Sequence, residues 1–99
     1  MCSRKVVVKN SNGIHLRIAS AIVATARQYK SEISLICSHG KGRKKYADAY
    51  SIVQLVLLQA LEGMSLMVRA DGPDESEAVD ALCRLLNVQE EHKTDPRGR

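Results

Sequence analysis

Residues 64–71 constrain the fold more strongly than any other part of the chain, because apolar residues occupy every second position there. This series consists of Met64, Leu66, Val68 and Ala70, and Met67 is the one apolar residue between its members. Successive side chains of a β-strand point to opposite faces, so the pattern predicts a strand with one buried face. A single strand cannot bury such a face. The segment therefore predicts a sheet whose apolar side is covered by other elements.

Three further segments have the composition of strands and can complete this sheet. Residues 5–9 form a β-branched run that ends in the turn sequence of residues 10–13. Residues 32–38 alternate as a half-buried strand does, and the glycine-containing residues 39–42 reverse the chain after them. Residues 43–47 are short and mostly polar, which suits the edge of a sheet. We therefore expect four strands, of which the second and third form a hairpin.

Two helices are predicted between these strands. From Leu16 onward apolar residues recur at spacings of three and four, and they form one stripe of Ile18, Ala19, Ile22, Val23, Ala26 and Tyr29. Ser51 and Gln54 match a capping box at the start of the second helix. The body of that helix, residues 55–61, is apolar nearly all round, and we expect Gly63 to end it.

A third helix is predicted near the end of the chain. The acidic and hydroxyl side chains of residues 74–77 are expected to cap it, and its apolar face contains Ala78, Leu82, Leu85 and Leu86. The element order is then β-α-β-β-α-β-α. This order predicts an α+β open-faced β-sandwich, in which helices cover one face of a four-stranded sheet. We expect one domain over residues 1–90 and a frayed polar tail over residues 91–99.

Composition narrows the class of protein further. No apolar run approaches the about 20 residues that span a bilayer, and residues 1–8 lack the apolar centre of a secretory signal, so we expect a cytoplasmic protein without membrane insertion.

Cys2, Cys37 and Cys83 form no close pair and are expected to be free thiols. No spacing of ligand residues indicates a metal site, and we expect no cofactor. The chain also lacks the residue sets of independent enzymes.

The charge of the chain favours acidic partners. Its formal net charge is +4, and a basic cluster at residues 41–45 falls at the expected tip of the hairpin. This cluster is read as a solvated turn, with a contact to RNA or DNA as the alternative. The chain contains no Trp, no Phe and only three Tyr, so few aromatic side chains are available to stack on nucleic-acid bases. We therefore expect no nucleic-acid partner.

His15 is the candidate functional residue, because a turn places it directly before the first predicted helix. The first N–H groups of a helix have no intrahelical partners, and the positive end of the helix attracts anions. A neutral imidazole is a nucleophile that can accept a phosphoryl group and release it, and the guanidinium of Arg17 can hold phosphate oxygens. The pattern predicts a phosphate-handling site, with a solvated turn as the alternative.

Residues 13–17, Gly-Ile-His-Leu-Arg, resemble the active-site segment of the HPr family, the histidine phosphocarriers of the bacterial phosphotransferase system. The similarity extends over about residues 5–87. Ser51 and the following Ile52 fall where HPr sequences have a regulatory serine with an aliphatic neighbour. Glu62-Gly63 and the acidic turn of residues 70–75 also match family positions. The HPr fold has the element order predicted above.

The resemblance implies a relay of a phosphoryl group. Enzyme I, charged by phosphoenolpyruvate, would phosphorylate Nδ1 of His15, which would pass the group to a sugar-specific acceptor protein of the phosphotransferase system. Arg17 would stabilise the phosphate together with the backbone N–H groups of Leu16 and Arg17. The implied docking surface for partners consists of Ser20, Ala24, Ile52, Val53 and Val56. We expect a monomeric carrier protein rather than an enzyme.

Ser51 has two explanations. It resembles the serine that HPr kinase/phosphorylase modifies in some bacteria, and its phosphate would place negative charge on the docking surface. Its capping role explains the hydroxyl equally well. A diverged HPr-like regulator, controlled at Ser51 with little or no transfer through His15, is the alternative to the carrier.

Two positions beside His15 depart from the family pattern. Ile18 stands where the family usually has proline, and Leu16 stands where it usually has alanine. Proline presets the first turn of a helix, so its absence is expected to loosen the site or to shift Arg17. The hairpin of residues 37–45 is also longer and more basic than is usual in the family.

Overall fold

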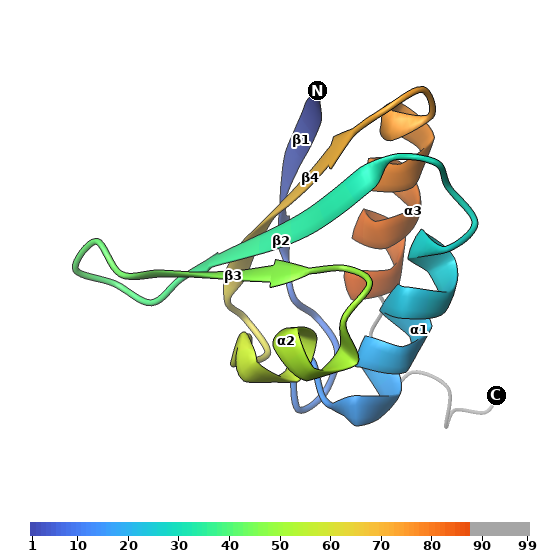
Figure 1. Cartoon of the computed structure of the whole chain (residues 1–99). Coiled ribbons are helices and arrows are strands. Elements are labelled where there is room, and N and C mark those ends of the chain that lie inside the picture. The colour runs from blue at the N-terminus through green and yellow to red at the C-terminus, as the bar shows by residue number, and fades with distance from the viewer. Residues whose placement is uncertain (88–99) are drawn as a thin grey trace, which may run out of the picture.

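The computed structural model describes residues 1–87, and their seven elements follow the predicted order (Figure 1). The elements are β1 (Cys2–Val7), α1 (Leu16–Ala26), β2 (Glu32–Ser38), β3 (Lys44–Asp48), α2 (Ile52–Leu57), β4 (Ser65–Asp71) and α3 (Glu75–Leu86). The predicted α+β class is confirmed. The predicted domain limit at residue 90 and the tail of residues 91–99 lie outside the described residues.

The four strands form one antiparallel sheet in the order β1-β4-β2-β3. β4, which has the clearest alternation in the sequence, lies inside the sheet, and its Val68 pairs with Arg4 of β1 and with Leu35 of β2. β2 and β3 form the predicted hairpin, and the charged β3 lies at an edge, as expected. Charged side chains at an edge discourage the pairing of further strands.

The three helices lie on one side of the sheet. α1 and α3 lie side by side along this face, and α2 packs against α1 and β3 (Figure 1). Leu66, Val68 and Ala70 point to the helical side and are at most 1% exposed. They belong to the same hydrophobic core as the buried stripe of α1, which is made of Ile18, Ala19, Ile22, Val23 and Ala26. Within residues 1–87 no element covers the other face, so the open-faced sandwich is confirmed.

The predicted end of the second helix is wrong. α2 covers only Ile52–Leu57, and Gln59, not Gly63, adopts the left-handed conformation after it, with a φ of 58°. The carbonyl oxygen of Ala60 accepts a hydrogen bond from the N–H of Ile14 at 2.9 Å. This contact with a distant loop takes the chain out of the helix. Gly63 instead lies in the turn before β4, where its φ is 91°.

The predicted start of the third helix is also corrected. Asp74 is the N-cap residue of α3, but its side chain makes no capping hydrogen bond. Its carboxylate accepts hydrogen bonds from the backbone N–H of Lys30, at 2.9 and 3.1 Å, and from Oγ of Ser31 at 2.7 Å. Glu75 Oε1 accepts the N–H of Gly72 at 3.1 Å. Asp74 therefore joins the turn after α1 to the turn before α3.

These hydrogen bonds predict how stability depends on pH. The Ser31 hydroxyl and then the Lys30 amide hold the pKa of Asp74 below its usual range. The native carboxylate therefore adds stability above the pKa of an unfolded Asp, about 3.9, and that stability is lost as pH falls through the native pKa. We expect Asp74→Asn to lower the free energy of unfolding at pH 7, by an amount that shrinks below about pH 4.

Urea unfolding followed by circular dichroism from pH 7 to pH 2.5 measures this effect. Glu77→Gln, at an exposed position in the first turn of α3, is the matched control and should leave the free energy of unfolding nearly unchanged. A destabilisation by Asp74→Asn that stayed constant over the whole pH range would contradict the assignment.

Candidate functional site

His15 is the N-cap residue of α1. Its backbone is extended, with φ −103° and ψ −175°, and its side chain makes no capping hydrogen bond. The residue is partly exposed, and its carbonyl oxygen accepts the first bond of the helix from Ala19 at 2.8 Å. The ring therefore stands at the start of an 11-residue helix without serving as its cap.

The first turn of α1 supplies donors beside the ring. The N–H groups of Leu16, Arg17 and Ile18 precede the first intrahelical bond, which Ala19 makes. No acidic side chain lies in this turn to oppose an anion. The end of the helix has a partial positive charge, which favours a phosphoryl group on the ring. Arg17 is exposed in the same turn.

Ile18 shows how the helix begins without the proline of the family. Its side chain is 5% exposed and belongs to the hydrophobic core. Burial of this side chain anchors the first turn from the inside, whereas proline would preset the backbone. α1 begins at Leu16 as the periodicity predicts, so the expected loosening does not prevent the helix start.

The loop before His15 is held by the segment that follows α2. Ile14 is 5% exposed, and its N–H donates to the carbonyl oxygen of Ala60 at 2.9 Å. Gly13 has a φ of 67°, and a Cβ atom on it would lie 2.1 Å from the same oxygen. Only glycine fits this close approach, because any side chain would displace the backbone of Ala60. The position of His15 thus depends on two loops distant in sequence.

The predicted docking residues lie on two neighbouring helices. Ser20 and Ala24 are exposed on α1, and Ile52, Val53 and Val56 are exposed on α2, which packs against α1. The sequence analysis missed two further exposed residues, Leu57 at 62% and Leu61 at 59%. The apolar run of residues 55–61 indicated that some of its side chains would be exposed. Which of them face solvent depends on how α2 packs in the fold. We call Ile52, Val53, Val56, Leu57 and Leu61 the α2 patch.

The α2 patch reaches the loop that holds His15. The Cα atom of Leu61 lies 2.6 Å from the position that a Cβ atom on Gly13 would take. Leu16, which follows His15, is itself 66% exposed. Exposed apolar side chains of this kind mark surfaces that bind other proteins. The candidate nucleophile therefore lies at one end of an apolar surface.

Ser51 caps α2, and the predicted capping box is only half formed. Ser51 Oγ accepts the N–H of Gln54 at 3.2 Å. The Gln54 side chain does not reach back to Ser51, because its Oε1 accepts the N–H of Asp48 at 2.9 Å. The Ser51 N–H donates to the Asp48 carbonyl at 3.0 Å instead. The cap is thus tied to the end of β3.

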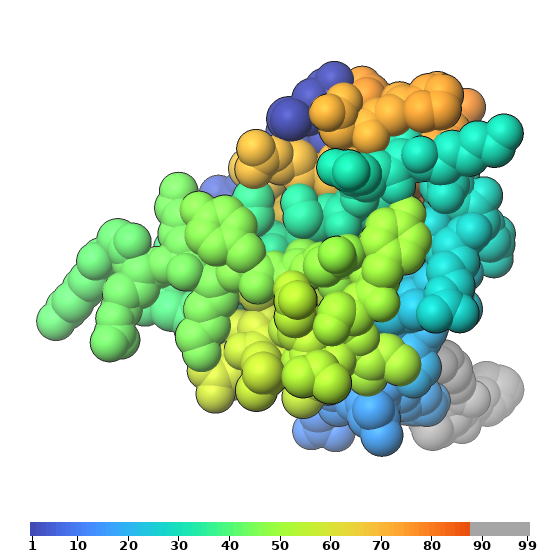
Figure 2. Space-filling model, in the orientation of Figure 1, coloured from blue at the N-terminus to red at the C-terminus, as the bar shows by residue number. Residues whose placement is uncertain are grey.

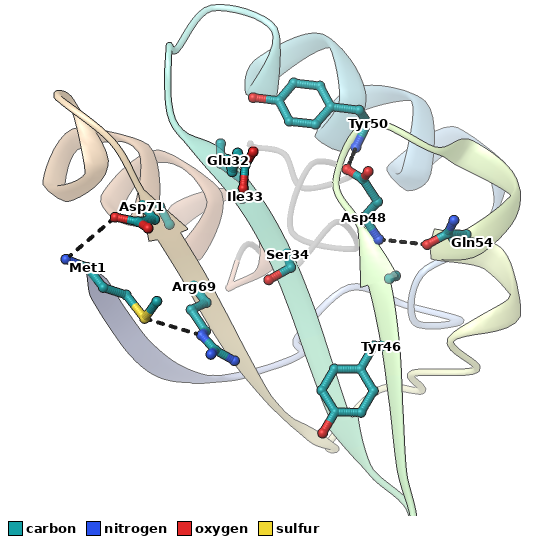
Figure 3. Close-up of a pocket in the computed structure, with 12 residues that line it drawn as sticks. Met1, Glu32, Ile33, Ser34, Tyr46, Asp48, Tyr50, Gln54, Arg69 and Asp71 are labelled. Carbon is teal, nitrogen blue, oxygen red and sulfur yellow. Dashed lines mark hydrogen bonds and ion pairs between the residues drawn. The ribbon is translucent and has the colours of Figure 1, made fainter.

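A hollow on the open face of the sheet is separate from this site (Figure 3). Arg69, Ser34 and Asp48 lie side by side across three strands at its floor, since Ser34 pairs with both of the others. His15, Arg17 and Ser51 do not line the hollow. The open face therefore plays no part in the arrangement around His15.

The cysteines and the other candidate metal ligands of residues 1–87 do not form a metal site. Cys2, Cys37 and Cys83 are free, and burial raises the pKa of the Cys37 and Cys83 thiols, which makes them less reactive. Within residues 1–87 no group of three His, Cys, Asp or Glu side chains could hold a metal ion. No helix in this part of the chain is long and apolar enough to cross a membrane.

The close approach at Gly13 predicts a large effect of one methyl group. Gly13→Ala would both strain a positive φ and push against the Ala60 carbonyl, so we expect it to lower the free energy of unfolding by about 3 kcal/mol. Gly42→Ala is the control, because Gly42 has a φ of 77° but nothing near its Cβ position, and it should cost about 1 kcal/mol. Urea unfolding of both variants measures the difference. Equal costs would mean that the contact with Ala60 is unimportant.

The cap at Ser51 predicts a smaller effect. Ser51→Ala removes the acceptor for Gln54 and should lower the free energy of unfolding by about 1 kcal/mol. Ser51→Asp keeps an acceptor at the same position and should come within a few tenths of a kcal/mol of the unaltered protein. Thermal and urea unfolding compare the three proteins. If the alanine and aspartate variants were equally stable, the cap would contribute nothing.

The chain is similar to known phosphocarrier proteins. A family model described as "PTS HPr component phosphorylation site" matches residues 2–88. The phosphocarrier protein HPr of Haemophilus influenzae is 38% identical over 90 residues, which cover 91% of this chain and 100% of the relative.

Solved structures agree as well. HPr from Bacillus anthracis has a TM-score of 0.75 at 25% identity, with 86% of this chain and 95% of that one covered. An HPr dimer from Thermoanaerobacter tengcongensis has a TM-score of 0.60 at 31% identity, with 97% of this chain and 100% of that one covered. Because one of these structures is a dimer, the monomeric state expected for this chain stays a prediction. The sequence and structural matches both extend over most of the chain, which therefore belongs to the HPr family of phosphocarrier proteins of the phosphotransferase system.

Proposed function

We propose that this phosphocarrier accepts a phosphoryl group from enzyme I on Nδ1 of His15 and passes it to an acceptor protein of the phosphotransferase system. One observation carries the proposal. His15 is a partly exposed N-cap residue whose ring makes no capping bond, at the start of a helix without acidic side chains in its first turn. We place this relay in the cytoplasm, and the protein acts in it as a covalent carrier rather than as an enzyme.

The chemistry needs a neutral ring nitrogen and a place for three phosphate oxygens. The lone pair of Nδ1 attacks the phosphorus atom on enzyme I, so a nitrogen–phosphorus bond forms as the bond to the donor breaks. The N–H groups of Leu16 and Arg17 then face the charged oxygens, and the Arg17 guanidinium adds a further donor. The second transfer reverses these steps, since the acceptor's nucleophile takes the phosphoryl group and leaves the ring neutral.

The docking surface follows from the same geometry. A donor or an acceptor must bring its own reactive group to His15, and the α2 patch begins beside the loop that holds this residue. Apolar side chains at the centre of an interface provide most of its binding energy. We therefore assign partner binding to Ser20 and Ala24 of α1 together with the α2 patch.

Ser51 provides a means of regulation within this surface. Its hydroxyl lies at the start of α2, directly before Ile52 and Val53 of the α2 patch. Phosphorylation by HPr kinase/phosphorylase would place two negative charges beside apolar residues that contact enzyme I. Such charges would oppose binding through desolvation and repulsion. The protein would then act as an HPr-like regulator when it is phosphorylated at this serine.

A transfer assay tests the carrier function. Incubation with enzyme I and labelled phosphoenolpyruvate should give a protein that carries label, and an acid-labile bond is expected because phosphorus is bound to nitrogen. His15→Ala should lose all of the label. His39→Ala is the matched control, because the His39 ring already bonds the Leu58 carbonyl at 2.9 Å, and this variant should reach the same final level of label as the unaltered protein.

Two results would overturn the proposal. Label that persists in His15→Ala would place the phosphoryl group on another residue. An unaltered protein that takes no label from enzyme I, while HPr kinase/phosphorylase and ATP label Ser51, would favour the regulator.

A further inference from the structure

The β2–β3 hairpin extends beyond the body of the protein. It projects to one side in Figures 1 and 2, and we call residues 39–45 the hairpin arm. Two backbone hydrogen bonds close its turn, from His39 N–H to the Arg43 carbonyl at 2.8 Å and from Arg43 N–H to the Gly40 carbonyl at 2.9 Å. The arm is therefore a defined turn rather than an open loop.

The arm carries the whole net charge of the chain. It contains four cations, Lys41, Arg43, Lys44 and Lys45, and no acidic residue. The chain has 15 basic and 11 acidic residues, so removal of these four would leave 11 of each sign. Within residues 1–87 no carboxylate forms an ion pair with Lys41, Arg43 or Lys44, and all three are exposed.

The arm is fastened to the end of α2. His39 Nε2 donates to the carbonyl oxygen of Leu58 at 2.9 Å, and Lys45 Nζ donates to Oε1 of Gln59. Leu58 and Gln59 directly follow Leu57 of the α2 patch and precede Leu61. These two bonds hold the base of the arm beside the apolar docking surface, while its turn projects away from the body.

This combination fits a protein better than a nucleic acid. Interfaces between proteins have an apolar centre and a polar rim, and here Lys45 at the base of the arm bonds Gln59, which lies between Leu57 and Leu61 of the α2 patch. Binding to a nucleic acid depends on many contacts to phosphates, but outside the arm the charges of this chain balance. The arm alone provides few such contacts.

We propose that the hairpin arm contacts carboxylates at the edge of the docking face of enzyme I and steers the association of the two proteins. This inference rests on the proposed phosphocarrier function, which names enzyme I as the donor. The donor binds the unphosphorylated protein, whose net positive charge is then greatest. Transfer adds negative charge at His15 and weakens the attraction, so the same arrangement promotes release.

Association kinetics with enzyme I test the arm without any phosphoryl transfer. The arm variant Lys41→Glu/Arg43→Glu should associate about tenfold more slowly at low salt, with a shallower dependence on ionic strength. The control Lys30→Glu/Arg84→Glu changes the net charge equally at exposed positions, after α1 and on α3, that are away from the arm, and it should slow association less than threefold. The rate of dissociation should change little in either variant, because charges at a rim act mainly on the encounter.

Three outcomes would overturn the inference. Equal slowing in the arm variant and in the control would show an effect of net charge alone. Unchanged association of the arm variant, with normal labelling of His15 in the unaltered protein, would remove the role of the arm and leave the carrier function intact. Salt-dependent binding of single-stranded RNA that the arm variant loses, without any change toward enzyme I, would assign the arm to nucleic acid.

An unaltered protein that neither binds enzyme I nor takes label would overturn the inference and the proposed function together. Labelling of His15 at saturating phosphorylated enzyme I separates the two, because it should reach the same final level in the arm variant and in the unaltered protein.

Discussion

The hydrogen bond from the Ile14 N–H to the Ala60 carbonyl, with Gly13 packed against the same oxygen, is the contact on which the rest of the site depends. It joins the loop before α1 to the segment after α2, two parts of the chain that are far apart in sequence. Because of it, the helix start that bears His15 lies beside the edge of the α2 patch. A nucleophile placed on one element and a docking surface on another can serve a relay only when such a contact holds them together.

The layered fold divides the remaining surface into parts with different chemistry. One face of the sheet is buried by the helices, so on that side of the molecule the exposed apolar side chains are those of the α2 patch and of Leu16. The open face contains a hollow that none of the predicted site residues line. The hairpin arm extends from the edge of the sheet and contains four cations, while two hydrogen bonds hold its base beside the end of α2.

Much of this architecture could be predicted from local patterns. The alternation of β2 and β4 and the stripe of α1 as far as Ala26 were correct, because burial on one face imposes a period of two in strands and of three to four in helices. Tyr29, predicted to continue the stripe, lies in the turn after α1. The predicted end of α2 at Gly63 was wrong, because Ala60 bonds a loop that no local pattern describes. Asp74 resembled a cap in the sequence, but its carboxylate bonds Lys30 and Ser31 across the fold.

The sequence by itself determined the order and type of the elements, the apolar face of each, and the placement of a histidine directly before a helix. These features depend on residues that are close together along the chain, so periodicity and capping rules describe them. Only the tertiary structure decided that α2 ends early, that Leu57 and Leu61 face solvent, that Asp74 joins two turns, and that the base of the basic arm lies beside the end of α2. Each of these depends on backbone groups brought together from distant positions, and such contacts have no period in the sequence to reveal them.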